Sequence, residues 1–223
     1  MHADLMVMLL ADARLPVAGH TQSNTLEAAV SAGLGRADVP GYLRSRLATI
    51  TVVDAATAVV ARAQVLRDGA AADLGAVERA WAARTASRAL REASRGQGRA
   101  LLRLAGRLWE SAPALDAVRT VAAPSRPVVL GAVAAATDVP ADSLARLVGY
   151  DDVQTVCAAA LKLLPLDPAE VASWALAALP QVDQLAGVVA GCVAPDDIPA
   201  LTHPQIEAWA QSHAHTTRRL FRA

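Results

Sequence analysis

Residues 84–108 read RTASRALREASRGQGRALLRLAGRL, and this stretch predicts a helical fold. Arginines recur every three or four residues, at positions 84, 88, 91, 95, 99, 103 and 107. At about 100° per residue they form a band along one side of a helix, while leucines and alanines gather on the other side. Such a band is typical of a solvated face. The alternative is a surface for anions or for a protein partner, because guanidinium groups suit carboxylates and phosphates.

Gly96 and Gly98 interrupt this helical pattern. Each glycine costs about 1 kcal/mol relative to alanine in a helix interior. Close approach of another backbone would offset that cost, so we expect tight packing at this point of the helix. The Gly-Gln-Gly sequence does not indicate a phosphate-binding loop, because it lacks a preceding strand and the GK[ST] ending of such loops.

The rest of the chain carries the same helical signature. Of 223 residues, 54% are hydrophobic and only 3% are aromatic, and roughly a quarter are alanine, the best helix former. Strand-like alternation nowhere exceeds four or five residues. We therefore expect an all-α fold, a bundle of about nine or ten helices in a single domain over residues 1–223. An apolar helix within residues 1–14 and a tail at residues 216–223 are the segments that partners would order.

Charge and cysteine content exclude several classes of function. Twenty-one basic residues balance twenty-one acidic ones, so no net field draws the molecule to nucleic acid or to an anionic membrane. Cys157 and Cys192 are isolated and lack the spacing of a zinc or redox motif. The N-terminus has no basic leader, and the uncharged apolar runs fall short of the roughly twenty residues of a membrane-spanning helix. We expect a soluble cytoplasmic protein that binds neither nucleic acid nor membrane.

A polar stretch near the N-terminus, LPVAGHTQSNTLE (residues 15–27), contains the residue types of a hydrolytic site. His20, Ser23 and Glu27 lie close in sequence, but such neighbours seldom form a triad, and no strand-to-helix nucleophile turn is present. Asn24 and Glu27 stand three residues apart, which is the spacing of a helix capping box. We therefore interpret the stretch as a loop and helix cap, and expect no catalysis.

Metal-binding patterns are equally weak. His213 and His215 are two residues apart on an expected helix, so their rings point about 200° apart and do not share one ion. The pairs Asp151–Asp152 and Asp196–Asp197 resemble aspartates of helical diphosphate-metabolising enzymes. Each pair lacks a third aspartate to hold magnesium, and we interpret both as helix caps and turns.

Four stretches resemble, in order, sequences typical of the urease accessory protein F (UreF) family. They are LPVAGHTQSNTLEAAVSAGL at residues 15–34, LREASRGQGRALLRLA at 90–105, RPVVLGAVAAATDVP at 126–140 and HAHTTRRLFRA at 213–223. Four collinear motifs that cover most of the chain are far more specific than any one of them. Some positions depart from the family pattern, among them Thr25, where glycine is frequent.

The resemblance implies an all-helical homodimer with no catalysis and no cofactor of its own. Members of the family bind the accessory protein UreD, also called UreH. That pair recruits the nickel-carrying GTPase UreG to apo-urease, where nickel is inserted and the active-site lysine is carbamylated. The resemblance therefore implies a urease maturation factor that works as a scaffold, with nickel handled by the complex.

The resemblance also implies residues that contact those partners. They are Gly19, His20, Ser23 and Glu27 in the N-terminal signature and Arg218, Arg219, Leu220 and Phe221 in the tail, and from the arginine band we add Arg95 and Arg99. Phe221 is the only phenylalanine and lies at the extreme end of the chain. An aromatic residue beside arginines is typical of a partner-binding anchor. The alternative is that Phe221 folds back onto its own domain.

A function of another class is a ligand-responsive transcription regulator, which the length and helix content also fit. Such a protein needs a helix-turn-helix with a basic recognition helix, usually near the N-terminus. Residues 1–50 contain none that is convincing. An enzyme of diphosphate chemistry is a more distant alternative, since no complete magnesium site is visible in the sequence.

Overall fold

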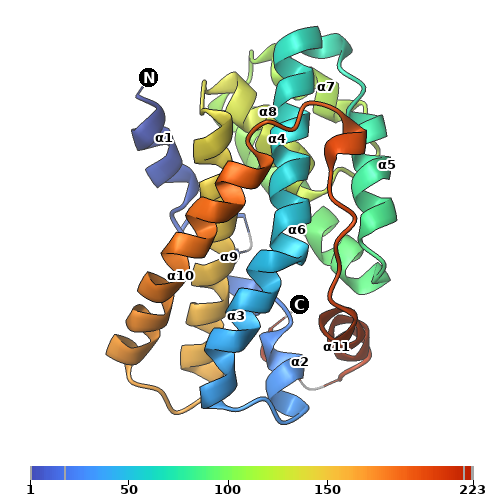
Figure 1. Cartoon of the computed structure of the whole chain (residues 1–223). Helices are drawn as coiled ribbons and strands as arrows, with labels where there is room; N and C mark the ends of the chain where they lie inside the picture. Colours follow the sequence, from blue (N-terminus) through green and yellow to red (C-terminus); the bar gives the residue numbers. More distant parts are fainter. Residues whose placement is uncertain (1, 18, 218, 222–223) are drawn as a thin grey trace.

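The computed structural model describes residues 2–17, 19–217 and 219–221 (Figure 1). These residues form one all-α domain in which no strand occurs, and the predicted fold class is confirmed. The α-helices are α1 (Ala3–Leu10), α2 (Leu26–Ser31), α3 (Val39–Ala48), α4 (Ile50–Asp68), α5 (Leu74–Arg84), α6 (Arg88–Leu108), α7 (Pro113–Arg119), α8 (Arg126–Ala136), α9 (Ala141–Leu163), α10 (Pro168–Val189) and α11 (Pro204–Ala214). Short 3-10 helices are η1 (Gly19–Thr21), η2 (Arg36–Asp38), η3 (Gly69–Ala71) and η4 (Pro195–Asp197). The count is close to the predicted one, and α7 is a short helix that the sequence pattern did not reveal.

The helix α4 forms the centre of the core. It packs against α8, α9 and α5, and most of its residues between Thr51 and Val65 are buried. A Cβ atom on Gly131 of α8 would lie 2.3 Å from the carbonyl oxygen of Ala58 and 2.7 Å from Cβ of Ala61. The glycine therefore lets the two helix backbones touch, and small side chains give an alanine-rich chain a dense core.

A local break in the helical backbone separates α3 from α4, which follow one another along the bundle (Figure 1). The β-branched cluster at residues 49–53 predicts such a break, and Thr49 has φ −131° and ψ −90° between the two helices. Among the described residues, one helical stretch, Arg36–Ala71, is long and apolar enough to cross a membrane by length and composition. Since 67% of its most apolar window is buried inside the protein, the stretch has the character of a core helix.

The helices α9 and α10 lie side by side along one flank of the bundle, with α1 against α9 (Figure 1). From the sequence, the proline at position 180 predicts that the helix after Pro168 ends at Leu179; this boundary is wrong, because α10 continues through Pro180 to Val189. Proline removes the hydrogen bond to the carbonyl group of Leu176 one turn earlier. Both residues are exposed, so water can hydrate that carbonyl group and the helix continues.

Close packing at the glycines of α6 is confirmed at one of the two positions. A Cβ atom on Gly98 would lie 2.2 Å from the carbonyl oxygen of Pro124 and 2.9 Å from the carbonyl carbon of Ser125. At Gly96 the nearest atom belongs to the flexible side chain of Arg99, at 3.9 Å. Gly98 therefore fixes the loop before α8 against α6, whereas Gly96 lies on the more open side of the helix.

Candidate functional site

The N-terminal signature folds as a loop whose backbone enters the left-handed region. Asn24 has φ 49° and Thr25 has φ 71°, a conformation that glycine adopts most easily. The predicted capping box is wrong, because the N-cap of α2 is Thr25, whose side chain makes no capping bond. The hydroxyl of buried Ser23 instead accepts a hydrogen bond from the backbone N–H of Glu27, at 3.3 Å. The side chain of Asn24 is thereby directed into the protein.

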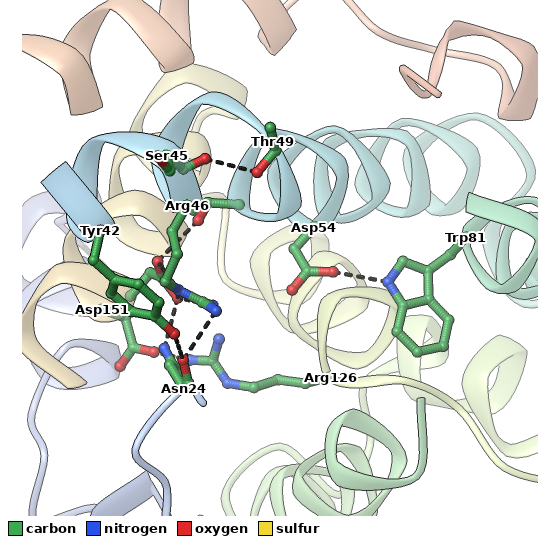
Figure 2. A network of polar contacts seen from close by, with 11 residues as sticks. Asn24, Tyr42, Ser45, Arg46, Thr49, Asp54, Trp81, Arg126 and Asp151 are labelled. Atoms are coloured by element: carbon green, nitrogen blue, oxygen red, sulfur yellow. Dashed lines mark hydrogen bonds and ion pairs between the residues drawn. The ribbon is translucent and has the colours of Figure 1, made fainter. Parts of the chain in front are cut away.

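A buried ion pair receives the side chain of Asn24 (Figure 2). Asp152 of α9 lies 2.6 Å from Nη2 of Arg46 on α3, and it also accepts hydrogen bonds from Asn24 at 2.6 Å and Thr51 at 2.9 Å. Arg46 and Tyr42 in turn donate to the carbonyl oxygen of Asn24. Burial raises the pKa of Tyr42 to about 12, so its hydroxyl remains a donor. The network fixes the loop to three helices.

The interpretation of Asp151–Asp152 as a cap or turn is wrong. Both residues lie inside α9 (Ala141–Leu163), where Asp152 completes the buried network and Asp151 pairs with Arg126 of α8 at 3.1 Å. The interpretation holds for Asp197, whose carboxylate accepts the backbone N–H groups of Val193 and Ala194 at 2.9 Å each. Sequence spacing alone did not distinguish a helix interior from a turn.

Glu27 joins the N-terminal signature to the end of the chain. One carboxylate oxygen accepts the backbone N–H of Leu220, and the other lies 2.9 Å from both the backbone nitrogen of Phe221 and Nε2 of His213. Burial disfavours the charge on Glu27, but the two backbone N–H groups and His213 outweigh it and lower the pKa. We call this arrangement the Glu27 clasp. It brings together two segments that the sequence proposed separately.

The clasp directs the last two described residues in opposite directions. Phe221 is 4% exposed and its ring lies 5.1 Å from Nζ of Lys162, so it folds back onto its own domain. It is not the exposed anchor that its position predicted, because its backbone N–H is held by Glu27. Leu220 is 63% exposed and Arg219 is also exposed. Arg218 lies outside the described residues.

Arg95, expected in a partner-binding surface, belongs to a second internal network. Its guanidinium lies 3.0 Å from Glu78 and 5.9 Å from the ring centre of Trp81. Glu78 also accepts the backbone N–H of Ser125, and Trp81 donates to Asp54 at 2.7 Å (Figure 2). Burial raises the pKa of Asp54 to about 6. Arg95 therefore holds α5, α6 and the loop before α8 together.

Two neighbouring cavities lie beside these networks. A small inner cavity of about 80 Å³ is bounded by Asp54, Asp152 and Arg126. An outer pocket of about 490 Å³ opens to solvent, with Arg99 and Arg219 among its lining residues. The two share Gln22, Thr25, Leu90, Ala93 and Gln97 as lining residues. The predicted residues Arg99 and Arg219 thus meet at one pocket, although they lie on α6 and in the tail.

The remaining predicted residues surround the same region. Gly19 and His20 lie in η1, and the end of η1, Thr21, lines the outer pocket. Within the described residues, no group of three His, Cys, Asp or Glu side chains is placed to hold a metal ion. The outer pocket is thus lined in part by the arginine side chains of Arg99, Arg103 and Arg219 and the amides of Gln22 and Gln97.

Several residues of this region were missed by sequence reasoning. Arg46, Asp152 and Lys162 pair with groups far away in the chain, and no local pattern marks such partners. His213 was considered only as one of two histidines, yet it is buried and contacts Glu27. One sequence feature could have revealed Arg46: it is a charged residue within an otherwise apolar face of α3, which indicates a buried charge with a partner.

Comparison with known proteins agrees with this architecture. The UreF family model matches residues 34–179. A urease accessory protein UreF from Mycobacterium sp. (strain JLS) is 36% identical over 217 residues, which cover 96% of both chains. The urease accessory protein UreF of Mycobacterium marinum is 34% identical over 219 residues, or 97% of both chains. That of Mycobacterium tuberculosis (strain ATCC 25177 / H37Ra) is 32% identical over the same length and share.

The family model covers most of the helical core and includes the motifs at residues 90–105 and 126–140, and the relatives are aligned over nearly the whole chain. Proteins of this family are non-catalytic accessory factors of urease maturation. The chain belongs to the UreF family of urease accessory proteins.

Proposed function

We propose that this protein is a cytoplasmic scaffold that binds UreD (UreH), and that the pair recruits the nickel-carrying GTPase UreG to apo-urease. Nickel insertion and carbamylation of the active-site lysine then take place in the assembled complex. The observation that carries the proposal is the Glu27 clasp, which presents exposed Leu220 and Arg219 beside the N-terminal signature in a protein of the UreF family. The chain itself performs no bond chemistry in this scheme.

The clasp supports a composite surface for UreD. Leu220 is a large apolar side chain that remains 63% exposed although its backbone N–H is fixed by Glu27. A fixed apolar side chain loses little conformational freedom on binding, which favours its use as an anchor. Arg219 stands beside it, and His213 supports the clasp from α11. In this scheme Leu220 replaces Phe221 as the apolar anchor of the tail.

A homodimer is the second part of the proposal. Exposed apolar residues gather on α1, α9 and α10, where Met8, Tyr150 and Leu179 border an apolar hollow of about 590 Å³. Exposed apolar surface of this kind is typical of an interface. Arg146 and Asp183 border the same hollow, so the face carries both signs of charge and suits a second copy of itself. Light scattering on a Met8→Glu variant tests this face, and an unchanged mass would contradict it.

Co-expression with UreD tests the surface at the clasp. We expect Leu220→Asp to reduce co-purification of UreD by about tenfold or more, because a charge replaces an apolar anchor. Leu66→Asp is the matched control, since Leu66 is 53% exposed at the distant end of α4. Urease activation in a host with the other accessory proteins should fall in parallel. Equal recovery of UreD with both variants would refute the proposed surface.

A further inference from the structure

The arginine band of residues 84–107 divides into two groups. The first four arginines donate to groups of the same chain: Arg84, at the end of α5, to the carbonyl groups of Ile198 and Ala80, and on α6 Arg88 to Glu92, Arg91 to the carbonyl groups of Thr85 and Ala86, and Arg95 to Glu78. Further along the helix, Arg99, Arg103 and Arg107 are exposed, and within the described part of the chain they have no hydrogen bond or ion pair. The solvated-face interpretation therefore fails for the first group and leaves the second to be explained.

Two of these exposed arginines face a concave surface. Arg99 and Arg103 line the outer pocket of about 490 Å³, together with Arg219 from the tail. Glu92 is the only acidic residue among the described residues that line it, and its carboxylate lies 2.6 Å from Arg88. The charge of Glu92 is therefore largely compensated on its own helix. The pocket carries a local positive charge in a protein whose formal net charge is zero.

The lining combines three kinds of group. Guanidinium groups stand at Arg99 and Arg103, and the amides of Gln22 and Gln97 supply neutral donors and acceptors. Small apolar side chains form part of the wall, contributed by Ala89, Leu90, Ala93, Ala210 and Ala214. An inorganic anion would use the guanidinium groups and leave that apolar wall without a partner. A carboxylate at the end of an aliphatic stem uses both, since arginine forks bind carboxylates in two-bonded geometry.

We propose that the outer pocket binds an acidic segment of a protein partner, with carboxylates on Arg99 and Arg103 and their aliphatic stems against the alanine-rich wall. The proposal rests on the proposed function as a scaffold for protein partners, and adds the chemistry of one docking segment. The Glu27 clasp holds Arg219 at the same pocket, because it fixes the two residues that follow Arg219. The pocket is thus complete only when the tail is docked.

A labelled peptide tests the pocket on the full-length protein. The probe is fluorescein-labelled hexaglutamate, with hexaglutamine of the same length as the neutral reference, and binding is read as fluorescence anisotropy. We expect hexaglutamate to bind more tightly than hexaglutamine, and an Arg99→Gln/Arg103→Gln variant to weaken it by about tenfold or more. Arg107→Gln is the matched control, because it removes the same charge from the same helix outside the pocket.

The outcomes separate the pocket from general charge attraction. Affinity of Arg107→Gln within about twofold of the unsubstituted protein supports the pocket, since a screened surface charge contributes little. Equal weakening by Arg107→Gln and by the double variant would overturn it, as would equal binding of the two peptides. Circular dichroism of the double variant should be unchanged, because both positions are exposed.

The same materials separate the pocket from the proposed function. If the protein co-purifies with UreD and activates urease but does not prefer hexaglutamate, the pocket proposal is overturned and the scaffold function stands. If it binds hexaglutamate selectively and the double variant does not, yet no urease partner associates with it, the scaffold function fails and the pocket stands. Loss of both peptide binding and urease activation in the double variant, but not in Arg107→Gln, supports both.

Discussion

Two aspartates that border the same inner cavity, buried Asp152 and half-buried Asp54, have very different surroundings. Asp152 is bound by the guanidinium of Arg46, the amide of Asn24 and the hydroxyl of Thr51. Asp54 has a single side-chain donor in the described part of the chain, Trp81. Burial raises the pKa of Asp54 to about 6. The comparison teaches that a buried carboxylate is stable as a charge only where enough donors replace water.

Removing Asp152 should have the largest effect. In Asp152→Ala the guanidinium of Arg46 stays buried without its carboxylate, and we expect a loss of about 3–5 kcal/mol in the free energy of unfolding. Urea titration at pH 7.5 measures the change. The matched control is Asp151→Ala at the next position, whose partner Arg126 is less buried and whose loss should cost under about 1 kcal/mol. Similar losses of stability in the two variants would contradict the special contribution of the buried Arg46–Asp152 pair.

At Asp54 we expect substitution to increase the free energy of unfolding, in contrast to the loss expected at Asp152. A folded-state pKa of about 6, raised from 3.8, means that stability is lost as the pH rises from about 4 to about 6. Asp54→Asn keeps an acceptor for Trp81 and has no charge, so it should gain about 2–3 kcal/mol at pH 7.5. Urea titrations across this pH range should show a flatter profile for the variant. A gain that is the same at pH 4 and pH 7.5 would exclude titration of Asp54 as its cause.

Glu27 should have the smallest effect on stability of the three carboxylates. It has three hydrogen-bonding partners, and its side chain is 13% exposed. Its pKa is lowered, so its contribution is present above the ordinary value of 4.5 and is lost as the pH falls through the folded value. In Glu27→Gln we expect a loss of about 1–2 kcal/mol at pH 7.5. Hydrogen exchange at the amides of Leu220 and Phe221 should accelerate. Unchanged exchange there would show that the carboxylate does not hold the tail.

The same contrast explains what could be predicted from the sequence. Local spacing predicted the helical character of residues 88–108, and the helix cost of glycine predicted the close contact at Gly98; both are confirmed, whereas Arg84 belongs to the end of α5 and residues 85–87 separate it from α6. The capping box at Asn24 failed because a partner distant in the chain, Asp152, competes for that side chain. Pro180 was misread because its exposure, which decides whether water can replace the lost bond, is a tertiary property.

The candidate site residues also differ in ways that only distant contacts decide. Arg95 and Arg99 are one helical turn apart and were indistinguishable in the band, yet one is bound to Glu78 and the other lines a pocket. Glu27 was selected as a contact for partners, and the structure adds that it binds the tail. Which arginine remains available depends on α5 and the loop before α8, and periodicity within one helix carries no information about them.

The Glu27 clasp also has a consequence for the order in which the protein is made. Glu27 and Leu220 are 193 positions apart, so the ribosome releases the carboxylate long before the backbone N–H groups that bind it. The clasp therefore forms only in chains that have been translated as far as Leu220 and Phe221. Chains that stop before this point lack the clasp even when their central helices fold, and with it the surface that we propose for UreD.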